Sequence, residues 1–205
     1  MSRALEILDL GAASILGRPL HGGERASFSK YLDMLQRWQR VHRLVGSSES
    51  EWIVDNLFLD SLVFLRLLSP VAASVVDVGT GAGFPGIPIK IVCPALAISL
   101  VESRERRVSF LSAVIRELDL REIRVLSGRA ESAPASMLGS HDAAVARCAG
   151  DPQDVMPVAA RLVRPGGMVI CSGPPAPRTL DLGEWVEVPG HREGSVRRFV
   201  VLRVE

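Results

Sequence analysis

The 205-residue sequence contains few cysteines and no long apolar run. Its three cysteines, Cys93, Cys148 and Cys171, are odd in number and lack the spacing of metal ligands. The sequence therefore predicts reduced thiols, no metal site and a cytoplasmic protein. No basic flank precedes an apolar segment near residue 1, and no apolar run is long enough to cross a bilayer. We therefore expect no secretory signal and no membrane association.

Net charge is also small. The 24 Lys and Arg residues nearly balance the 23 Asp and Glu residues, giving +1, so no global basic field predicts a nucleic-acid partner. Only Lys30 and Lys90 are lysines; the other basic residues are arginines. Arg37, Arg40 and Arg43 share one face of a predicted helix. They form either a phosphate-contacting ridge of an RNA-binding protein or an ordinary solvated helix face.

The first third of the chain has a helical pattern. Apolar residues recur at helical spacing over residues 2–16, 23–44 and 52–68, and Pro70 ends the third predicted helix. Hydrophobic residues make up 47% of the chain, which is enough for one α/β domain with a sizeable core plus an extension. We therefore predict a helical extension over residues 1–70 and a second domain over residues 71–205.

After Pro70, short apolar runs alternate with helical patterns. This alternation is typical of a parallel sheet with crossover helices. Two further strands near the end form a closing hairpin, whose last strand we expect to be antiparallel. The predicted strands are 75–78, 97–101, 123–126, 142–146, 168–171, 185–188 and 196–204, and the predicted helices are 85–92, 104–118 and 151–163. A turn is predicted at residues 164–167, and a rigid loop bordering the site at 172–177.

The most informative segment is VVDVGTGAGFPGIP, which begins at Val75. A short buried strand is followed by a turn with alternating glycines and then by a helix whose first turn tolerates proline. Glycines have no Cβ, so a ligand can approach the backbone of this turn closely. The segment therefore predicts a ligand site at the end of the first strand.

Two ligands fit this segment. Gly81-x-Gly83-x-x-Gly86 satisfies the dinucleotide-binding pattern. The longer pattern Asp77-x-Gly79-x-Gly81-x-Gly83 instead resembles the first motif of class I S-adenosylmethionine-dependent methyltransferases. A carboxylate at the strand end suits the ammonium group of S-adenosyl-L-methionine and would repel a pyrophosphate. We therefore favour the methyltransferase interpretation over a dinucleotide site, and both over a glycine-rich turn without a ligand.

Three later strand ends carry further candidates. Glu102 follows the glycine turn by about 20 residues, and a carboxylate at this position can accept hydrogen bonds from the hydroxyls of a ribose. The alternative is an exposed acid at the strand end without a ligand. Arg147 follows the fourth predicted strand and could hold the cofactor carboxylate, an RNA phosphate or a structural salt bridge. Ala130 and Glu131 follow the third strand, in the loop that faces adenine in class I methyltransferases, although Glu131 could instead cap a short helix.

Nearly the whole chain resembles the glucose-inhibited division protein B family, whose members methylate N7 of a guanine in 16S ribosomal RNA. The glycine segment with its GFPGIP end is a quite specific part of the resemblance. Arg116-Glu117-Leu118 and Leu59-Asp60-Ser61-Leu62 also match. The resemblance implies a class I methyltransferase fold, a Rossmann-like α/β sheet of seven mostly parallel strands with an N-terminal helical extension. It also implies S-adenosyl-L-methionine as cofactor, ribosomal RNA or the small ribosomal subunit as partner, and a monomer. Taken with the glycine turn, the cofactor-binding residues it predicts are Asp77, Gly79, Gly81, Gly83, Phe84, Glu102, Ala130, Glu131 and Arg147.

The sequence departs from the family pattern mainly on the side expected to face RNA. Asn56-Leu57 replaces an Arg-His pair and Ser172-Gly173 replaces a Lys-Gly pair; smaller departures occur at Gln39 and at residues 43–45. These changes motivate the alternative of a diverged methyltransferase acting on a small molecule or on a different RNA site. A cofactor-binding protein without catalysis is a third possibility.

The predicted chemistry needs no catalytic acid or base. Guanine N7 has an in-plane lone pair and no proton, so methylation requires mainly that N7 be positioned in line with the methyl carbon. Cys148 is the one candidate nucleophile for pyrimidine C5 chemistry, but no proline precedes it and a packing role is favoured. We therefore name no catalytic residue.

Overall fold

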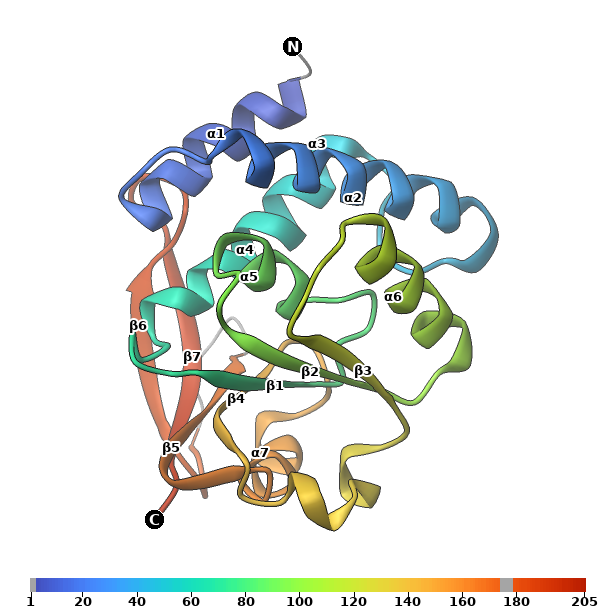
Figure 1. The fold of residues 1–205 in the computed structure, drawn as a ribbon. Coiled ribbons are helices and arrows are strands. Elements are labelled where there is room, and N and C mark those ends of the chain that lie inside the picture. Colours follow the sequence, from blue (N-terminus) through green and yellow to red (C-terminus); the bar gives the residue numbers. More distant parts are fainter. Residues whose placement is uncertain (1–2, 174–178) are drawn as a thin grey trace.

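A seven-stranded sheet with the order β3-β2-β1-β4-β5-β7-β6 forms the centre of the fold (Figure 1). The computed structural model describes residues 3–173 and 179–205. Strands β1 to β5 pair in parallel, whereas β7 is antiparallel to both β5 and β6. The predicted sheet and its antiparallel last strand are therefore confirmed. The strands are β1 Ser74–Val78, β2 Ala97–Glu102, β3 Ile123–Ser127, β4 His141–Ala146, β5 Val163–Ser172, β6 Glu184–Pro189 and β7 Val196–Arg203.

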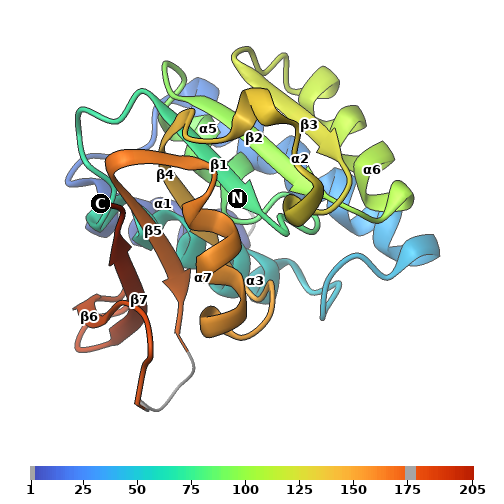
Figure 2. The ribbon, with the colours of Figure 1, turned by 90° about the horizontal axis from the view of Figure 1, so that it is seen from below.

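Helices cover the two faces of this sheet unequally. The N-terminal helices lie on one face together with α5 and α6, and α7 lies on the other face (Figures 1 and 2). Among the described residues, no helix is both long enough and apolar enough to cross a membrane. The longer helices are α1 Arg3–Leu16, α2 Gly22–His42, α5 Gly86–Val92, α6 Glu105–Glu117 and α7 Pro152–Ala160; two short 3₁₀ turns, η3 Ala130–Ser132 and η4 Ala135–Met137, follow β3.

The third predicted helix forms as one helical segment with changing geometry. It runs through α3 Ser50–Ile53, the π-helical η1 Val54–Leu59, α4 Asp60–Leu62 and the 3₁₀ turn η2 Val63–Arg66. Two acids on this segment, Asp55 and Asp60, are buried. Because a buried carboxylate is costly without partners, both acids require cations from elsewhere in the fold.

One hydrophobic cluster joins the N-terminal helices to the sheet. Tyr31 of α2 lies at its centre and stacks on Phe58 and Phe84 at ring-centroid distances of 5.2 and 5.5 Å. The Tyr31 hydroxyl donates a hydrogen bond to the Ala82 carbonyl in the glycine turn. The N-terminal helices therefore pack directly behind the glycine turn.

The segment before β5 differs from its prediction. The predicted helix over 151–163 is too long, since α7 ends at Ala160 and β5 begins at Val163. The predicted turn at 164–167 forms an irregularity inside β5, where the register with β4 shifts between His141 and Ala143. Of the predicted loop at 172–177, residues 172 and 173 are described, and residues 174–177 lie outside the described residues.

Lys90 is a buried amine inside α5. Its Nζ donates to the carbonyls of Pro94 at 2.8 Å, Leu96 at 2.6 Å and Glu122 at 3.3 Å. Lys90 is 2% exposed. The Glu122 carbonyl also accepts from the Ile98 amide at 2.9 Å, so Lys90 matters most as a donor to Pro94 and Leu96. Lys90 thereby connects the end of α5 to the loops that precede β2 and β3.

We expect Lys90→Met to lower the free energy of unfolding by about 2 to 3 kcal/mol, because the buried Leu96 carbonyl and the Pro94 carbonyl lose their Lys90 donor. Urea denaturation measures this change. Lys30→Met on the exposed face of α2 is the matched control and should change stability by less than about 0.5 kcal/mol. Equal effects of the two substitutions would contradict the assigned role of Lys90.

Candidate functional site

A buried carboxylate holds the glycine turn at the end of β1. Asp77 Oδ2 accepts hydrogen bonds from the Thr80 hydroxyl at 2.6 Å and from the Gly86 amide at 2.8 Å. These donors lie at the two ends of the turn, so one side chain fixes both the exit from β1 and the start of α5. The sequence prediction placed Asp77 near the ligand; the structure gives it a second role inside the turn.

Asp77 has an unusually high pKa for an aspartate. Burial raises its pKa to about 7, although the hydrogen bonds from Thr80 and Gly86 and the charge of Arg147 act in the opposite direction. Its second oxygen, Oδ1, is buried and has no hydrogen-bond partner among the described residues. A buried acceptor without a donor is rare in native proteins and is consistent with a polar or cationic ligand group nearby.

Two glycines of the turn are required by geometry. Gly79 has φ +68, and a Cβ at this position would lie 2.8 Å from the Cβ of Ala149. At Gly86 a Cβ would lie 2.4 Å from Leu100 Cδ2 and 2.8 Å from Asp77 Oδ2. The first glycine therefore allows the close approach of the loop after β4, and the second allows the Asp77 hydrogen bond.

Glu102, at the end of β2, faces the same turn. Its Oε2 accepts from the Gly81 amide at 3.0 Å and its Oε1 accepts from the Arg104 amide at 2.8 Å. Arg107 Nη1 lies 3.7 Å from Oε2. Each carboxylate oxygen can accept two hydrogen bonds, so the oriented carboxylate keeps one acceptor position on each oxygen. That geometry suits the two neighbouring hydroxyls of a ribose.

These strand ends surround a cavity of about 370 Å³. Three carboxylates, Glu102, Glu131 and Asp154, contribute to its lining, against one cation, Arg129. Ligands of open α/β sheets bind at this carboxyl edge of the strands. The excess of negative charge favours a cationic ligand with hydroxyls and disfavours a pyrophosphate. The remaining lining residues are Val78, Gly79, Val101, Ser103, Gly128, Ala130, Ala149, Gly150, Val155 and Val158.

The cavity brings together four of the predicted residues: Gly79, Glu102, Ala130 and Glu131. Glu131 lies inside the short turn η3. Gly81 contributes through its amide bond to Glu102. A contact between each of these residues and a bound cofactor stays a prediction.

The other predicted residues lie away from the cavity lining. Phe84 is buried in the aromatic cluster with Tyr31 and Phe58. Gly83 lies close behind it, where a Cβ would be 2.7 Å from the Tyr31 hydroxyl. These two residues connect the glycine turn to the N-terminal helices, and their roles as direct cofactor contacts stay predictions.

Arg147 makes two contacts with the N-terminal helical segment. Its Nε donates to Asp60 Oδ2 at 2.8 Å and its Nη2 donates to the Asn56 carbonyl at 2.6 Å. Arg197 of β7 donates to the same Asp60 oxygen at 3.1 Å. The structure therefore has the salt bridge that was one of the alternatives from the sequence; a cofactor or phosphate contact of Arg147 stays a prediction.

Sequence reasoning missed the contribution of α7. Asp154, Val155 and Val158 of this helix form one wall of the cavity. Their only sequence signal is their position on a helix that follows the fourth strand. Ala149 and Gly150 were also missed, although they directly follow Arg147 and Cys148.

The departures from the family pattern have ordinary structural roles in this fold. Leu57 is buried in the core, and the Asn56 side chain donates to the Trp52 carbonyl one helical turn earlier. Ser172 pairs with Phe199 at the end of β5. None of these three residues lines the cavity of about 370 Å³.

Comparisons with a family model and with curated proteins indicate the same family. A family model described as "GidB: rRNA small subunit methyltransferase G" matches residues 24–172. Two similar proteins are both named ribosomal RNA small subunit methyltransferase G. The one from Clostridium botulinum (strain Loch Maree / Type A3) is 35% identical over 184 residues, which cover 87% of this chain and 75% of that protein. The one from Acetivibrio thermocellus is 39% identical over 127 residues, covering 62% of this chain and 52% of that protein, so the match spans about half the length of this relative.

Solved structures agree on the fold. A SAM-dependent methyltransferase from Aquifex aeolicus aligns with a TM-score of 0.56 at 16% identity, over 75% of this chain and 93% of that one. A precorrin-6y C5,15-methyltransferase from Geobacter metallireducens aligns with a TM-score of 0.50 at 14% identity, over 80% of this chain and 92% of that one. At these identities the likeness concerns the fold alone, and it confirms the predicted class I methyltransferase architecture.

The raised pKa of Asp77 predicts how stability depends on pH. The folded chain binds this proton more tightly than the unfolded chain, so the stabilisation is complete below the ordinary pKa of 3.8 and is lost as pH rises through about 7. Asp77→Asn should therefore flatten the fall in unfolding free energy between about pH 4 and 7, a fall of about 2 to 4 kcal/mol in the parent chain. Urea denaturation across this pH range measures the slope.

Asp142→Asn is the control for this experiment. Burial opposes ionisation of Asp142, but hydrogen bonds from Ala73 and Ser74 and the charge of Arg164 lower its pKa. The stabilisation that ionised Asp142 provides is therefore lost only as pH falls below the ordinary aspartate pKa of 3.8. Asp142→Asn should reduce stability yet keep the slope between about pH 5 and 7. An unchanged slope in Asp77→Asn would show that Asp77 is ionised throughout.

Proposed function

The chain belongs to the GidB family, rRNA small subunit methyltransferase G, and from this we propose that it transfers a methyl group from S-adenosyl-L-methionine to N7 of a guanine in 16S ribosomal RNA. The substrate is ribosomal RNA or the small ribosomal subunit. The observation that carries the cofactor assignment is the acidic cavity at the carboxyl ends of β1, β2 and β3.

The residues of the cavity fit this cofactor. S-adenosyl-L-methionine is a cation with an ammonium group, a ribose and an adenine ring, and it supplies an activated methyl group when bound. Glu102 has free acceptor positions for ribose hydroxyls, while Val101, Ala130 and Val158 provide apolar surface for a planar ring. The lack of a Cβ at Gly79 allows close approach to the backbone. Three carboxylates complement a cation and would repel the pyrophosphate of a dinucleotide.

The proposed chemistry places few demands on side chains. Guanine N7 carries a lone pair in the plane of the ring and no proton, so no base is required for its methylation. The chain then acts by holding the guanine in line with the methyl carbon and by keeping water from the reacting atoms, and positioning of this kind supplies several kcal/mol. The target base must also be unstacked to reach the cavity, which favours a nucleotide in a loop.

Methyl transfer from labelled S-adenosyl-L-methionine to small ribosomal subunits, prepared from a strain that lacks this protein, tests the function. Mass spectrometry of the digested RNA should find one N7-methylguanosine per subunit. Methylation of another base, or of small molecules only, would favour a diverged methyltransferase. Intact cofactor binding without transfer to subunits, naked RNA or metabolites would overturn the proposal.

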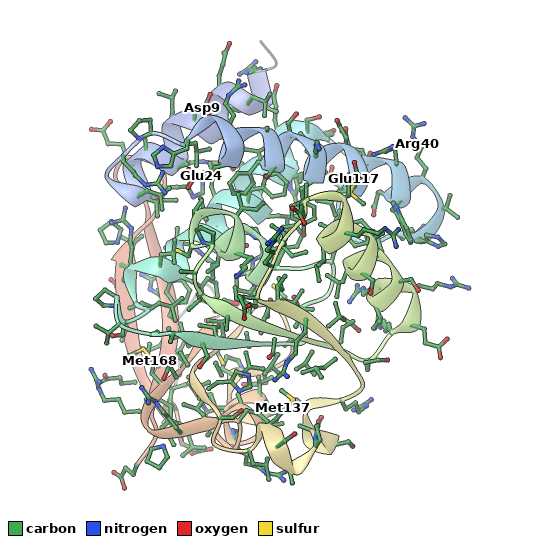
Figure 3. The ribbon with its side chains drawn as sticks, in the orientation of Figure 1. Asp9, Glu24, Arg40, Glu117, Met137 and Met168 are labelled. Carbon is green, nitrogen blue, oxygen red and sulfur yellow. The ribbon has the colours of Figure 1, made fainter. Side chains whose placement is uncertain are left out.

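Glu102 should control cofactor affinity. We expect Glu102→Gln to raise the Kd for S-adenosyl-L-methionine about 10- to 100-fold, because a charged acceptor for hydroxyls and for the Gly81 and Arg104 amides is lost. Isothermal titration calorimetry measures the change. Glu117→Gln, at the exposed last residue of α6 (Figure 3), is the control and should leave the Kd within about twofold. Equal Kd values for both variants would exclude the assigned role of Glu102.

A further inference from the structure

A second cavity, of about 400 Å³, lies between the end of α2 and the start of α6. Five of its lining residues are basic or carry an imidazole, and Glu105 is the one acid in the lining. The remaining residue, Leu44, is buried. This composition contrasts with the acidic cavity described above. The lining residues are His42, Arg43, Leu44, Arg104, Glu105, Arg106 and Arg107.

Three of these arginines have no counter-charge. Within the part of the chain that the structure describes, no carboxylate lies within ion-pair distance of Arg43, Arg104 or Arg106, and all three are exposed. By contrast, Arg18 and Arg25 in the N-terminal region are paired, with Glu24 and Asp9. The clustered positive charge therefore has no internal partner among the described residues and is available to an anion.

Packing fixes the relative position of these basic residues. Trp38 of α2 meets Phe110 of α6 edge to face at 5.3 Å and contacts His42 at 5.4 Å. Arg43 ends α2 in a left-handed conformation with φ 44, which turns the chain sharply after the helix. The cavity is thus held by the aromatic contacts between two helices that are distant in sequence.

The basic cavity is connected to the acidic one. Arg107 lines the basic cavity and lies 3.7 Å from Glu102, which lines the acidic cavity. Arg37 and Arg40 of α2 are also exposed, and Figure 3 shows Arg40 directed away from the body of the protein. The link between the two cavities is therefore Arg107 with Glu102.

We propose that Arg43, Arg104 and Arg106 form a subsite for the phosphodiester backbone of the RNA, adjacent to the cofactor cavity. Guanidinium groups bind phosphate oxygens through paired hydrogen bonds, and phosphate contacts set the register of a protein on its nucleic acid. The inference rests on the proposed function, because it assigns this subsite to the same RNA that presents the guanine. Arg107 is less free for phosphate because it neighbours Glu102.

Binding of a fluorescein-labelled single-stranded RNA at several salt concentrations tests the subsite. Neutralising three phosphate contacts, in Arg43→Gln/Arg104→Gln/Arg106→Gln, should reduce the slope of log Kd against log salt by about 2 to 3. The KM for small ribosomal subunits should rise about tenfold or more. The Kd for S-adenosyl-L-methionine should stay within about twofold, because none of the three side chains lines the acidic cavity.

Two further variants make the result specific. Arg43→Lys/Arg104→Lys/Arg106→Lys keeps the three charges and should keep most of the salt slope. Arg121→Gln/Arg161→Gln/Arg203→Gln removes three exposed charges elsewhere and should leave the slope nearly unchanged. If the first glutamine triple variant has the slope of this control, the subsite is excluded. If the salt slope falls but the parent protein methylates no RNA, the subsite stands and the proposed methyl transfer fails.

Discussion

The hydrogen bonds to Asp77 are the constraint on which the site depends. By accepting from Thr80 and from Gly86, one buried carboxylate fixes the turn that leads from β1 into α5. The turn then presents the Gly81 amide to Glu102, which orients the second carboxylate. Because Asp77 is removed from water, its pKa rises to about 7. The fold of the turn therefore favours the protonated form of this acid.

Buried acids also connect the N-terminal helices to the rest of the fold. Asp55 accepts from His191 at 2.8 Å and pairs with Arg192, while Asp60 pairs with Arg147 and Arg197. Asp55 lies within the π-helical segment η1, and Asp60 directly follows it. The removal of both partners of either acid would leave an uncompensated buried charge, which is strongly destabilising. The helical extension is thus tied by charge as well as by the shared hydrophobic cluster to the sheet that carries the site.

Opposite charges are separated along one edge of the molecule. Carboxylates gather in the acidic cavity and arginines gather between α2 and α6, with the Glu102–Arg107 pair at the boundary. A cation and a polyanion must meet at a methyltransferase site that acts on RNA, and each needs a surface of the opposite sign. The small net charge of +1 hides this separation, because the two patches largely cancel in the total.

Features of this protein that depend on local chemistry were predictable from the sequence. Alternation of apolar runs and helical patterns predicted the sheet, and the spacing of Asp77, the glycines and Glu102 predicted the edge that holds the cavity. Contacts between side chains that are distant in sequence required the folded structure. Arg147 pairs with Asp60, 87 residues away in sequence, and α7 supplies one wall of the cavity. Periodicity and turn chemistry depend on residues that are close in sequence. The partner of a buried charge depends instead on how the helices pack on the sheet.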